Sequence, residues 1–196
     1  MANEYATLAD LKASVEPSIS DLEDDVNLSR LLTIASRSID LECDRYFYST
    51  SDPIYLRGDG TARLNVSPGI LTLTEVAVDV DGDAGYSDVW ETTEYRLEPT
   101  LTTGAAVYPA SSVRALDGRY FPADAETLVR LTGTFGWAAV PEVIQQATLM
   151  LAIRLWKRAS SPLGVSGFGD MGPVYVRSKD EDIARLISPM KRWSVG

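Results

Sequence analysis

The stretch DDVNLSRLLTIASRSIDLECDRY, residues 24–46, decides how the first part of the chain folds. Its apolar residues recur every three or four positions, the spacing that lines one face of an α-helix. They are Leu28, Leu31, Leu32, Ala35, Ile39, Cys43 and Tyr46. The opposite face carries Asp24, Arg30, Arg37, Asp40 and Asp44. The pattern predicts an amphipathic helix of about five or more turns, capped by Ser20 or Asp21, which needs a partner surface.

A shorter helix is expected before it. Thr7 followed by Asp10 resembles a capping box, a side-chain pattern that begins helices, and Pro17 ends the segment. Cys43 falls on the apolar face of the long helix. We therefore expect it to be a small buried side chain, with a reactive thiol as the weaker alternative.

The pattern changes between residues 52 and 135 to β-branched residues, alternating polarity and turn signals. Strands are expected at 54–56, 62–66, 70–80, 88–97, 112–116 and 127–134, with a further candidate around Val107. The segment 67–69 separates the second and third strands, and the segment 81–85 is a turn. These features predict an antiparallel β module of about five or six strands, inserted between helical parts.

Another helix is expected to begin at Pro141. Few of its positions are polar, so we expect it to be buried on most sides. Residues 160–173 are rich in glycine, serine and proline and predict a loop. A last short helix is expected from Ser178 to Ser188, and Pro189 ends it. This end of the chain is either an arm that contacts another molecule or a helix folded back on its own core.

The expected fold class is therefore α+β. A helical core, in which the long amphipathic helix packs on a buried helix, carries an inserted antiparallel β module and a C-terminal helical arm. The expected bounds are 1–50 for the N-terminal helices, 51–138 for the β module, 139–159 for the core helix, 160–173 for the loop and 174–196 for the arm.

Two features of the composition limit the chemistry. The 196 residues include no histidine, the side chain that most often serves as a general base and a transition-metal ligand. A single cysteine, Cys43, excludes an internal disulfide and a cysteine-based zinc site. We therefore expect no catalytic residues, no metal and no cofactor, and a carboxylate-dependent enzyme stays a minor alternative.

Charge and hydropathy limit the partners and the location. The 28 acids and 18 bases give a net charge of −10, which argues against a free DNA-binding module. Residues 1–44 hold ten acids and three bases, whereas residues 141–196 hold five acids and eight bases. Such unlike ends suit contact between molecules, with solvated helix faces as the alternative. No apolar run reaches 18 residues and the N-terminus is acidic, so we expect a cytosolic, unprocessed protein.

Two motifs suggest ligands, and each lacks the context its site requires. Residues 167–172 match GxGxxG, but Pro173 and a β-like stretch follow where a dinucleotide site needs a helix. Asp79, Asp81 and Asp83 alternate as in a calcium loop, but Ala84 and Trp90 occupy the positions that need glycine and glutamate. An acidic hairpin tip is the preferred interpretation of these aspartates.

The order of short helix, long helix, β module, buried helix, glycine-rich loop and terminal helix resembles one family. It is similar to the head–tail connector (adaptor, or head-completion) proteins of long-tailed bacteriophages and phage-like gene transfer particles. The segments that carry the resemblance are distributed along most of the chain: 5–12, 32–40, 43–47, 56–60, 64–66, 73–80, 94–99, 133–137 and 140–141 with the helix that follows.

The resemblance implies a structural, non-enzymatic virion protein of the head–tail junction, made in the host cytoplasm. Family members form a ring, typically of twelve copies, below the portal protein. The ring extends the DNA exit channel and offers a surface to a tail-completion or stopper protein. DNA would pass without specific binding, and an acidic lumen that repels phosphate suits such passage.

The resemblance also assigns residues 174–196 to contact with the portal. The side chains expected at this portal or neighbour interface are Ile183, Leu186, Ile187, Met190, Lys191, Arg192 and Trp193. Arg154, Lys157 and Arg158 are expected near an acidic surface of a neighbouring subunit. The alternatives are another virion component, such as a tail-completion or tail-terminator protein, and a cytosolic binding module that uses the β module.

Overall fold

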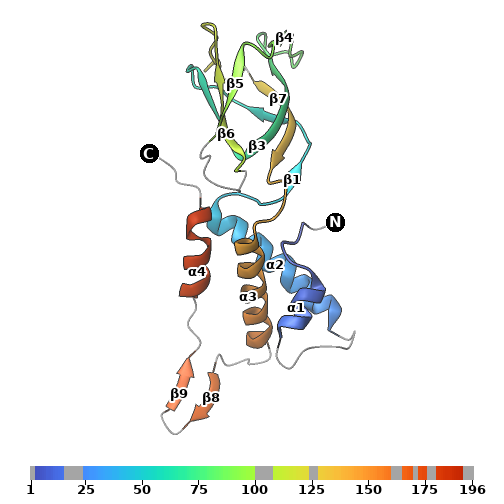
Figure 1. Cartoon of the computed structure of the whole chain (residues 1–196), viewed down its shortest axis with the longest axis vertical. Helices are drawn as coiled ribbons and strands as arrows, with labels where there is room; N and C mark the ends of the chain where they lie inside the picture. Colours follow the sequence, from blue (N-terminus) through green and yellow to red (C-terminus); the bar gives the residue numbers. More distant parts are fainter. Residues whose placement is uncertain are drawn as a thin grey trace. The chain divides into compact units, whose positions relative to one another are not determined.

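The structure is a computed structural model, and it describes residues 3–15, 24–99, 108–123, 128–159, 165–169, 172–175 and 180–191. The chain divides into two compact units. The helical unit comprises residues 1–47 and 140–196, and the β module comprises residues 48–139 (Figure 1). Helices and an antiparallel sheet occur in one chain, so the expected α+β class is confirmed.

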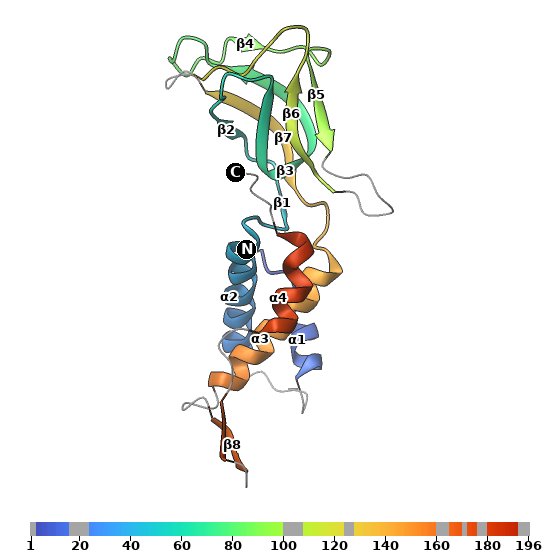
Figure 2. The same ribbon diagram turned by 90° about the vertical axis from the view of Figure 1, so that its left-hand side faces the viewer.

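The helical unit brings together helices from both ends of the chain. These are α1 (Leu8–Ser14), α2 (Asp25–Cys43), α3 (Glu142–Ala159) and α4 (Glu181–Ile187). Helix α3 packs against α1, α2 and α4 (Figure 2). None of the helices in the described part of the chain is long and apolar enough to span a membrane.

The helix ends follow local side-chain and backbone chemistry. The Thr7 hydroxyl accepts a hydrogen bond from the backbone N–H of Asp10 at 3.1 Å, so the expected cap of the first helix is confirmed. Helix α2 ends at Cys43, three residues before Tyr46, because Asp44 adopts a left-handed conformation with φ of 52°. The expected caps of α2 at Ser20 and Asp21 lie outside the described residues.

The apolar face predicted for α2 is buried. Leu28, Leu32, Ala35, Ile39 and Cys43 all have exposed fractions of 2% or less. Burial raises the pKa of the Cys43 thiol to about 11, which leaves little reactive thiolate near neutral pH. Cys43 is thus the small buried hydrophobic residue that the sequence predicted.

The β module is a seven-stranded antiparallel sheet. Its strands are β1 (Ser49–Thr50), β2 (Ile54–Leu56), β3 (Arg63–Val78), β4 (Asp88–Val89), β5 (Tyr95–Pro99), β6 (Ala110–Ala115) and β7 (Val129–Gly136). The order along the sheet is β1-β7-β3-β6-β5, with β2 paired to β7 and β4 to β3. The expected strand around Val107 lies outside the described residues.

One strand is longer than predicted. The break expected at 67–69 is absent, because β3 continues through it for 16 residues with a register shift between Asn65 and Ile70. Gly69 permits this passage, since its φ is +115° and an added Cβ would lie 2.8 Å from Cβ of Pro109. Strand β3 therefore pairs with β6 through its first half and with β7 through its second half.

A second correction concerns residues 160–173, where a loop was expected. The described part of this segment contains β8 (Val165–Gly169) and the start of β9 (Gly172–Tyr175), which pair as an antiparallel hairpin. The described residues of the GxGxxG motif, 167–169 and 172, therefore lie on two strands, and β9 follows where a dinucleotide site needs a helix. That arrangement lacks the helix N-terminus on which a dinucleotide site holds pyrophosphate.

Candidate assembly surfaces

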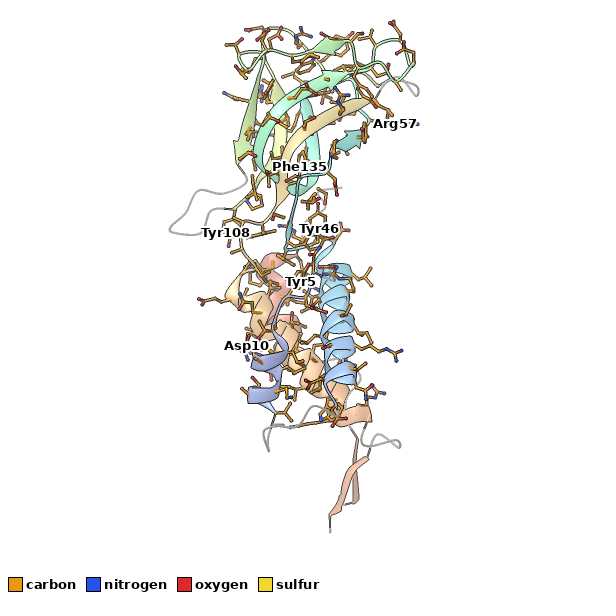
Figure 3. The ribbon with its side chains drawn as sticks, turned by 90° about the vertical axis from the view of Figure 1, so that its right-hand side faces the viewer. Tyr5, Asp10, Tyr46, Arg57, Tyr108 and Phe135 are labelled. Carbon is orange, nitrogen blue, oxygen red and sulfur yellow. The ribbon has the colours of Figure 1, made fainter. Side chains whose placement is uncertain are left out.

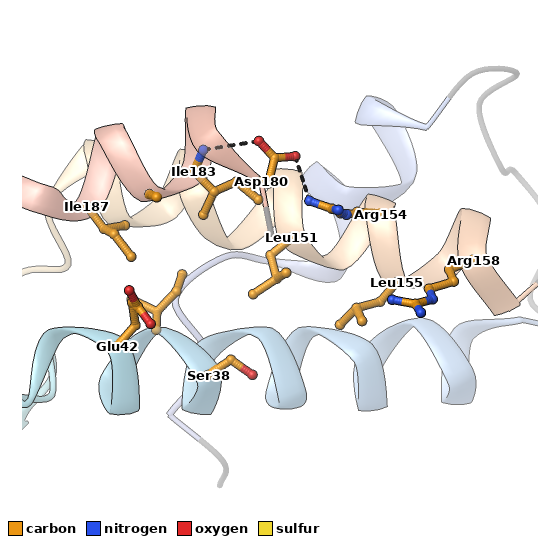
Figure 4. Close-up of a pocket in the computed structure, with 11 residues that line it drawn as sticks. Ser38, Glu42, Leu151, Arg154, Leu155, Arg158, Asp180, Ile183 and Ile187 are labelled. Atoms are coloured by element: carbon orange, nitrogen blue, oxygen red, sulfur yellow. Dashed lines mark hydrogen bonds and ion pairs between the residues drawn. The ribbon is translucent and has the colours of Figure 1, made fainter. Parts of the chain in front are cut away.

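Asp180 anchors the final helix to the rest of the helical unit. Its Oδ1 accepts hydrogen bonds from the backbone N–H groups of Asp182 at 3.0 Å and Ile183 at 3.4 Å, which caps α4. Its Oδ2 lies 3.0 Å from Nη1 of Arg154 on α3 (Figure 4). One carboxylate therefore both begins α4 and ties it to α3.

A cavity of about 210 Å³ lies between α2, α3 and α4. Leu151 and Leu155 of α3 line it together with Ile183 and Ile187 of α4 (Figure 4). Ile183 and Ile187, both expected at a portal or neighbour interface, are buried inside their own chain. For residues 180–191 the structure therefore shows a helix folded back on its own core.

The other residues expected at that interface are less buried. Leu186, Met190 and Lys191 are half-buried. Met190 is the last residue of the 3₁₀ turn Ser188–Met190 (η1), and Lys191 follows it. Lys191 pairs with Glu42 of α2. Arg192 and Trp193 lie outside the described residues.

The three bases expected at a subunit contact have different surroundings. Arg154 is engaged within its own chain by Asp180. Lys157 and Arg158 are exposed on the last turn of α3, where positive side chains also interact favourably with the helix dipole. Within one subunit, Arg154 therefore acts as an intramolecular link, whereas Lys157 and Arg158 present charge to the surroundings.

Tyr5 joins the N-terminal segment to the end of α2 (Figure 3). Its backbone N–H donates to Oγ of Ser36 at 3.1 Å, and its hydroxyl accepts from the backbone N–H of Phe47 at 2.8 Å and donates to Asp40. Burial raises the pKa of the Asp40 carboxyl, while the bond from Tyr5 and the charge of Arg37 oppose that rise. Burial also raises the pKa of the Tyr5 phenol.

Helix α2 has a second apolar stripe on its outer side. Val26, Ile34 and Leu41 lie on the face opposite the buried one, and Val26 and Leu41 are 80% and 86% exposed. Arg30 and Arg37 share this outer face. The sequence predicts the charges of this face but not its apolar residues, because the apolar period of the buried face is stronger and by itself explains the helix. Exposed apolar side chains are typical of contact surfaces where they form a contiguous patch.

Three arginines form a row on the outer face of the β module. Arg63 of β3 pairs in register with Arg114 of β6, and Arg114 pairs with Arg96 of β5. All three surround Glu98, whose Oε2 accepts from Nε of Arg63 at 2.8 Å and whose Oε1 lies 3.5 Å from Arg96 and from Arg114. The hydrogen bond from Arg63 is the main reason that the pKa of Glu98 is lowered.

Sequence reasoning did not find this arginine row. The three residues lie on three strands and belong to no local motif; strand register alone aligns them. The available signal was weak: each arginine occupies an outward position in a segment that alternates in burial.

The acidic residues of the β module divide into paired and exposed groups. Asp88 and Glu94 both pair with Arg119, and Glu75 pairs with Arg130. These contacts are internal to the module. The pairs with Arg119 hold β4 and the residue before β5 against the segment that follows β6. The pair with Arg130 links β3 to β7.

The loop between β3 and β4 contains the three aspartates that suggested a calcium site. Asp79 is buried and its Oδ2 accepts from the backbone N–H of Ala84 at 3.0 Å, whereas Asp81 and Asp83 are exposed. Among the described residues, no three His, Cys, Asp or Glu side chains are placed to hold a metal ion. The loop is the acidic tip that the sequence predicts.

No family model matches this chain, and no curated protein matches it in sequence.

Solved structures of gene transfer agent (GTA) particles contain chains of the same fold. One, from the neck of an empty GTA particle computed with C6 symmetry, matches with a TM-score of 0.59 at 18% identity over 100% of this chain and 98% of that chain. A chain in the virion of a native GTA particle matches with 0.59 at 17% identity, covering 98% and 93%. A third, from the neck of a native GTA particle computed with C12 symmetry, matches with 0.57 at 19% identity, covering 100% and 98%. Over its whole length, this chain therefore shares its fold with chains of GTA particles.

Proposed function

We propose that this chain is a structural subunit of the neck of a phage-like particle, acting as the connector between the portal protein and the tail. Copies of the chain form a ring below the portal and extend the channel through which DNA leaves the head. The opposite side of the ring binds a tail-completion or stopper protein. The protein acts by assembly and catalyses no reaction.

The observation that carries this proposal is the likeness to GTA neck chains across 100% of this chain, including both the helical unit and the β module. The C6 and C12 symmetries of those necks support a cyclic assembly, and we propose twelve copies. A cyclic ring needs two different contact patches on each subunit. The exposed apolar stripe of α2 and the arginine row of the β module are candidates for such patches.

The charge of the chain supports its role as a DNA conduit. A net charge of −10 produces a field that repels phosphate, so DNA passing through a ring of such subunits would not be held. This surplus of negative charge would let DNA pass through a ring at the head–tail junction without being bound specifically.

Contact with the portal is assigned to the outer side of the C-terminal segment. Leu186, Met190 and Lys191 are the described residues of that set that remain partly accessible, and Arg192 and Trp193 follow them. Ile183 and Ile187 position α4 through their burial in the helical unit. Lys157 and Arg158 are assigned to an acidic surface of the adjacent subunit.

Deleting the gene and imaging the particles by electron microscopy tests the function. We expect DNA-filled heads without tails, and supplying the wild-type gene should restore tailed particles carrying ring density next to the portal. Tailed particles of normal infectivity after the deletion would refute the proposal. Density at the tail side of the neck, away from the portal, would instead indicate a tail-completion protein.

A further inference from the structure

The arginine row of the β module carries more positive charge than its surroundings balance. Arg63, Arg96 and Arg114 are 57%, 60% and 47% exposed, and within the described residues the ion pairs that they make all go to one carboxylate, Glu98. Like charges placed directly opposite on neighbouring strands destabilise a sheet. With Glu98 paired most closely to Arg63, the row keeps a surplus of two positive charges.

Guanidinium groups in a fixed array bind carboxylates and phosphates through paired hydrogen bonds. The same β module supplies carboxylates: residues 64–95 include seven acids and no lysine or arginine. Glu75, Asp88 and Glu94 pair inside the module, and Asp79 is buried. This leaves Asp81, Asp83 and Glu91, which are all exposed. Asp81 and Asp83 lie together in the loop between β3 and β4, which can be followed in Figure 2.

We propose that the arginine row of one copy binds the acidic loop, Asp81 and Asp83, of the β module in the adjacent copy. The inference rests on the proposed ring, because contact between two unlike patches is what repeats around a closed ring. The two surplus guanidinium charges are opposite in sign and equal in number to the two carboxylates of this loop. A phosphate ligand is less favoured, because a chain with a net charge of −10 repels nucleic acid.

Paired substitutions in the full chain test this contact. Arg96→Gln with Arg114→Gln removes the surplus charge and leaves the close Arg63–Glu98 pair intact, which protects the fold. Asp81→Asn with Asp83→Asn neutralises the loop. Each double variant should raise the dissociation constant for ring assembly about tenfold or more, measured by sedimentation velocity and electron microscopy of the protein alone and in purified particles.

A charge exchange makes the test specific. A chain carrying Arg96→Glu, Arg114→Glu, Asp81→Arg and Asp83→Arg should assemble with itself far better than chains carrying either half of the exchange. Arg57→Gln, at an exposed arginine outside the row, is the matched control and should assemble as wild type (Figure 3). Circular dichroism of every variant checks that the sheet is retained.

The outcomes separate this inference from the proposed function. Wild-type protein that forms no ring, alone or in particles, overturns both. Rings that form equally well from wild type and from both double variants overturn the contact alone. If the arginine variant instead loses binding to short duplex DNA at low salt while assembly is unchanged, the row is a phosphate site and the inference fails.

Discussion

The β module and the helical unit are stabilised by different kinds of contact. The β module is one contiguous segment, and its 14 clustered core residues come from β3, β5, β6 and β7 together with Trp90 and Phe121. The helical unit joins two distant parts of the chain, and its last helix is attached by two buried isoleucines and by ion pairs to α2 and α3. A large apolar core tolerates the loss of a polar contact, whereas a short helix attached at few points does not.

The largest effect is expected for Phe121→Ala in the β module. Phe121 is fully buried and stacks on Trp90 with ring centroids 4.9 Å apart. Removing the ring leaves a cavity, so the free energy of unfolding of the β module should fall by about 3–5 kcal/mol. Urea unfolding followed by tryptophan fluorescence measures it. Tyr120→Ala, at the exposed neighbouring residue, is the control; an equal loss there would contradict the role of the core.

A smaller effect in the helical unit is expected for Tyr5→Phe. The substitution keeps the ring against Phe47 but removes the hydrogen bond that the Tyr5 hydroxyl accepts from the backbone N–H of Phe47 and the one that it donates to Asp40. Unfolding of the helical unit should become easier by about 1–3 kcal/mol. Hydrogen exchange of the α2 amides measures this change.

The matched control is Tyr55→Phe, at an exposed tyrosine of β2. Unchanged protection of α2 in Tyr5→Phe would show that apolar packing alone holds the N-terminal segment in place.

Substitutions of Asp180 separate its two contributions to the stability of α4, the helix cap and the ion pair with Arg154. Asp180→Ala removes the cap and the ion pair to Arg154, and should destabilise α4 by about 0.5–2 kcal/mol. Asp180→Asn keeps a capping oxygen and loses the charge, so it should cost less, about 0–1 kcal/mol. Amide exchange of residues 183–187 distinguishes them. Equal losses in the two variants would assign the whole effect to the ion pair.

The stabilities of the two units should depend on pH in opposite directions through one carboxyl group each, Glu98 in the β module and Asp40 in the helical unit. The lowered pKa of Glu98 means that its contribution is present above the ordinary glutamate pKa and is lost as pH falls. The raised pKa of Asp40 means that its contribution is present at low pH and is lost as pH rises through that raised value. Acidification should therefore weaken the β module through Glu98 and favour the helical unit through Asp40.

Thermal unfolding between about pH 7 and pH 3 measures both trends. Glu98→Gln should flatten the pH dependence of the β module, and Asp40→Asn should flatten that of the helical unit. A pH profile that neither substitution changes would contradict both assignments.

Part of the molecule follows from patterns within a few neighbouring residues. The spacing of apolar residues in 24–46 determines the buried face of α2, and with it the burial of Cys43. The Thr7–Asp10 pair determines the start of α1, and alternation with turn signals determines that the middle of the chain forms strands. Each of these is set by interactions over one or two turns, or along a single strand.

Contacts between distant residues were decided by the tertiary structure alone. Arg63, Arg96 and Arg114 become neighbours because of the strand register. The hydrogen bond between Tyr5 and the end of α2 depends on how the N-terminal segment lies. Ile183 and Ile187 are buried because α4 folds back on the helical unit. The physical reason is that side chains many residues apart become neighbours only when the backbone has chosen its pairings. That choice minimises the free energy of the whole unit, which no local pattern contains.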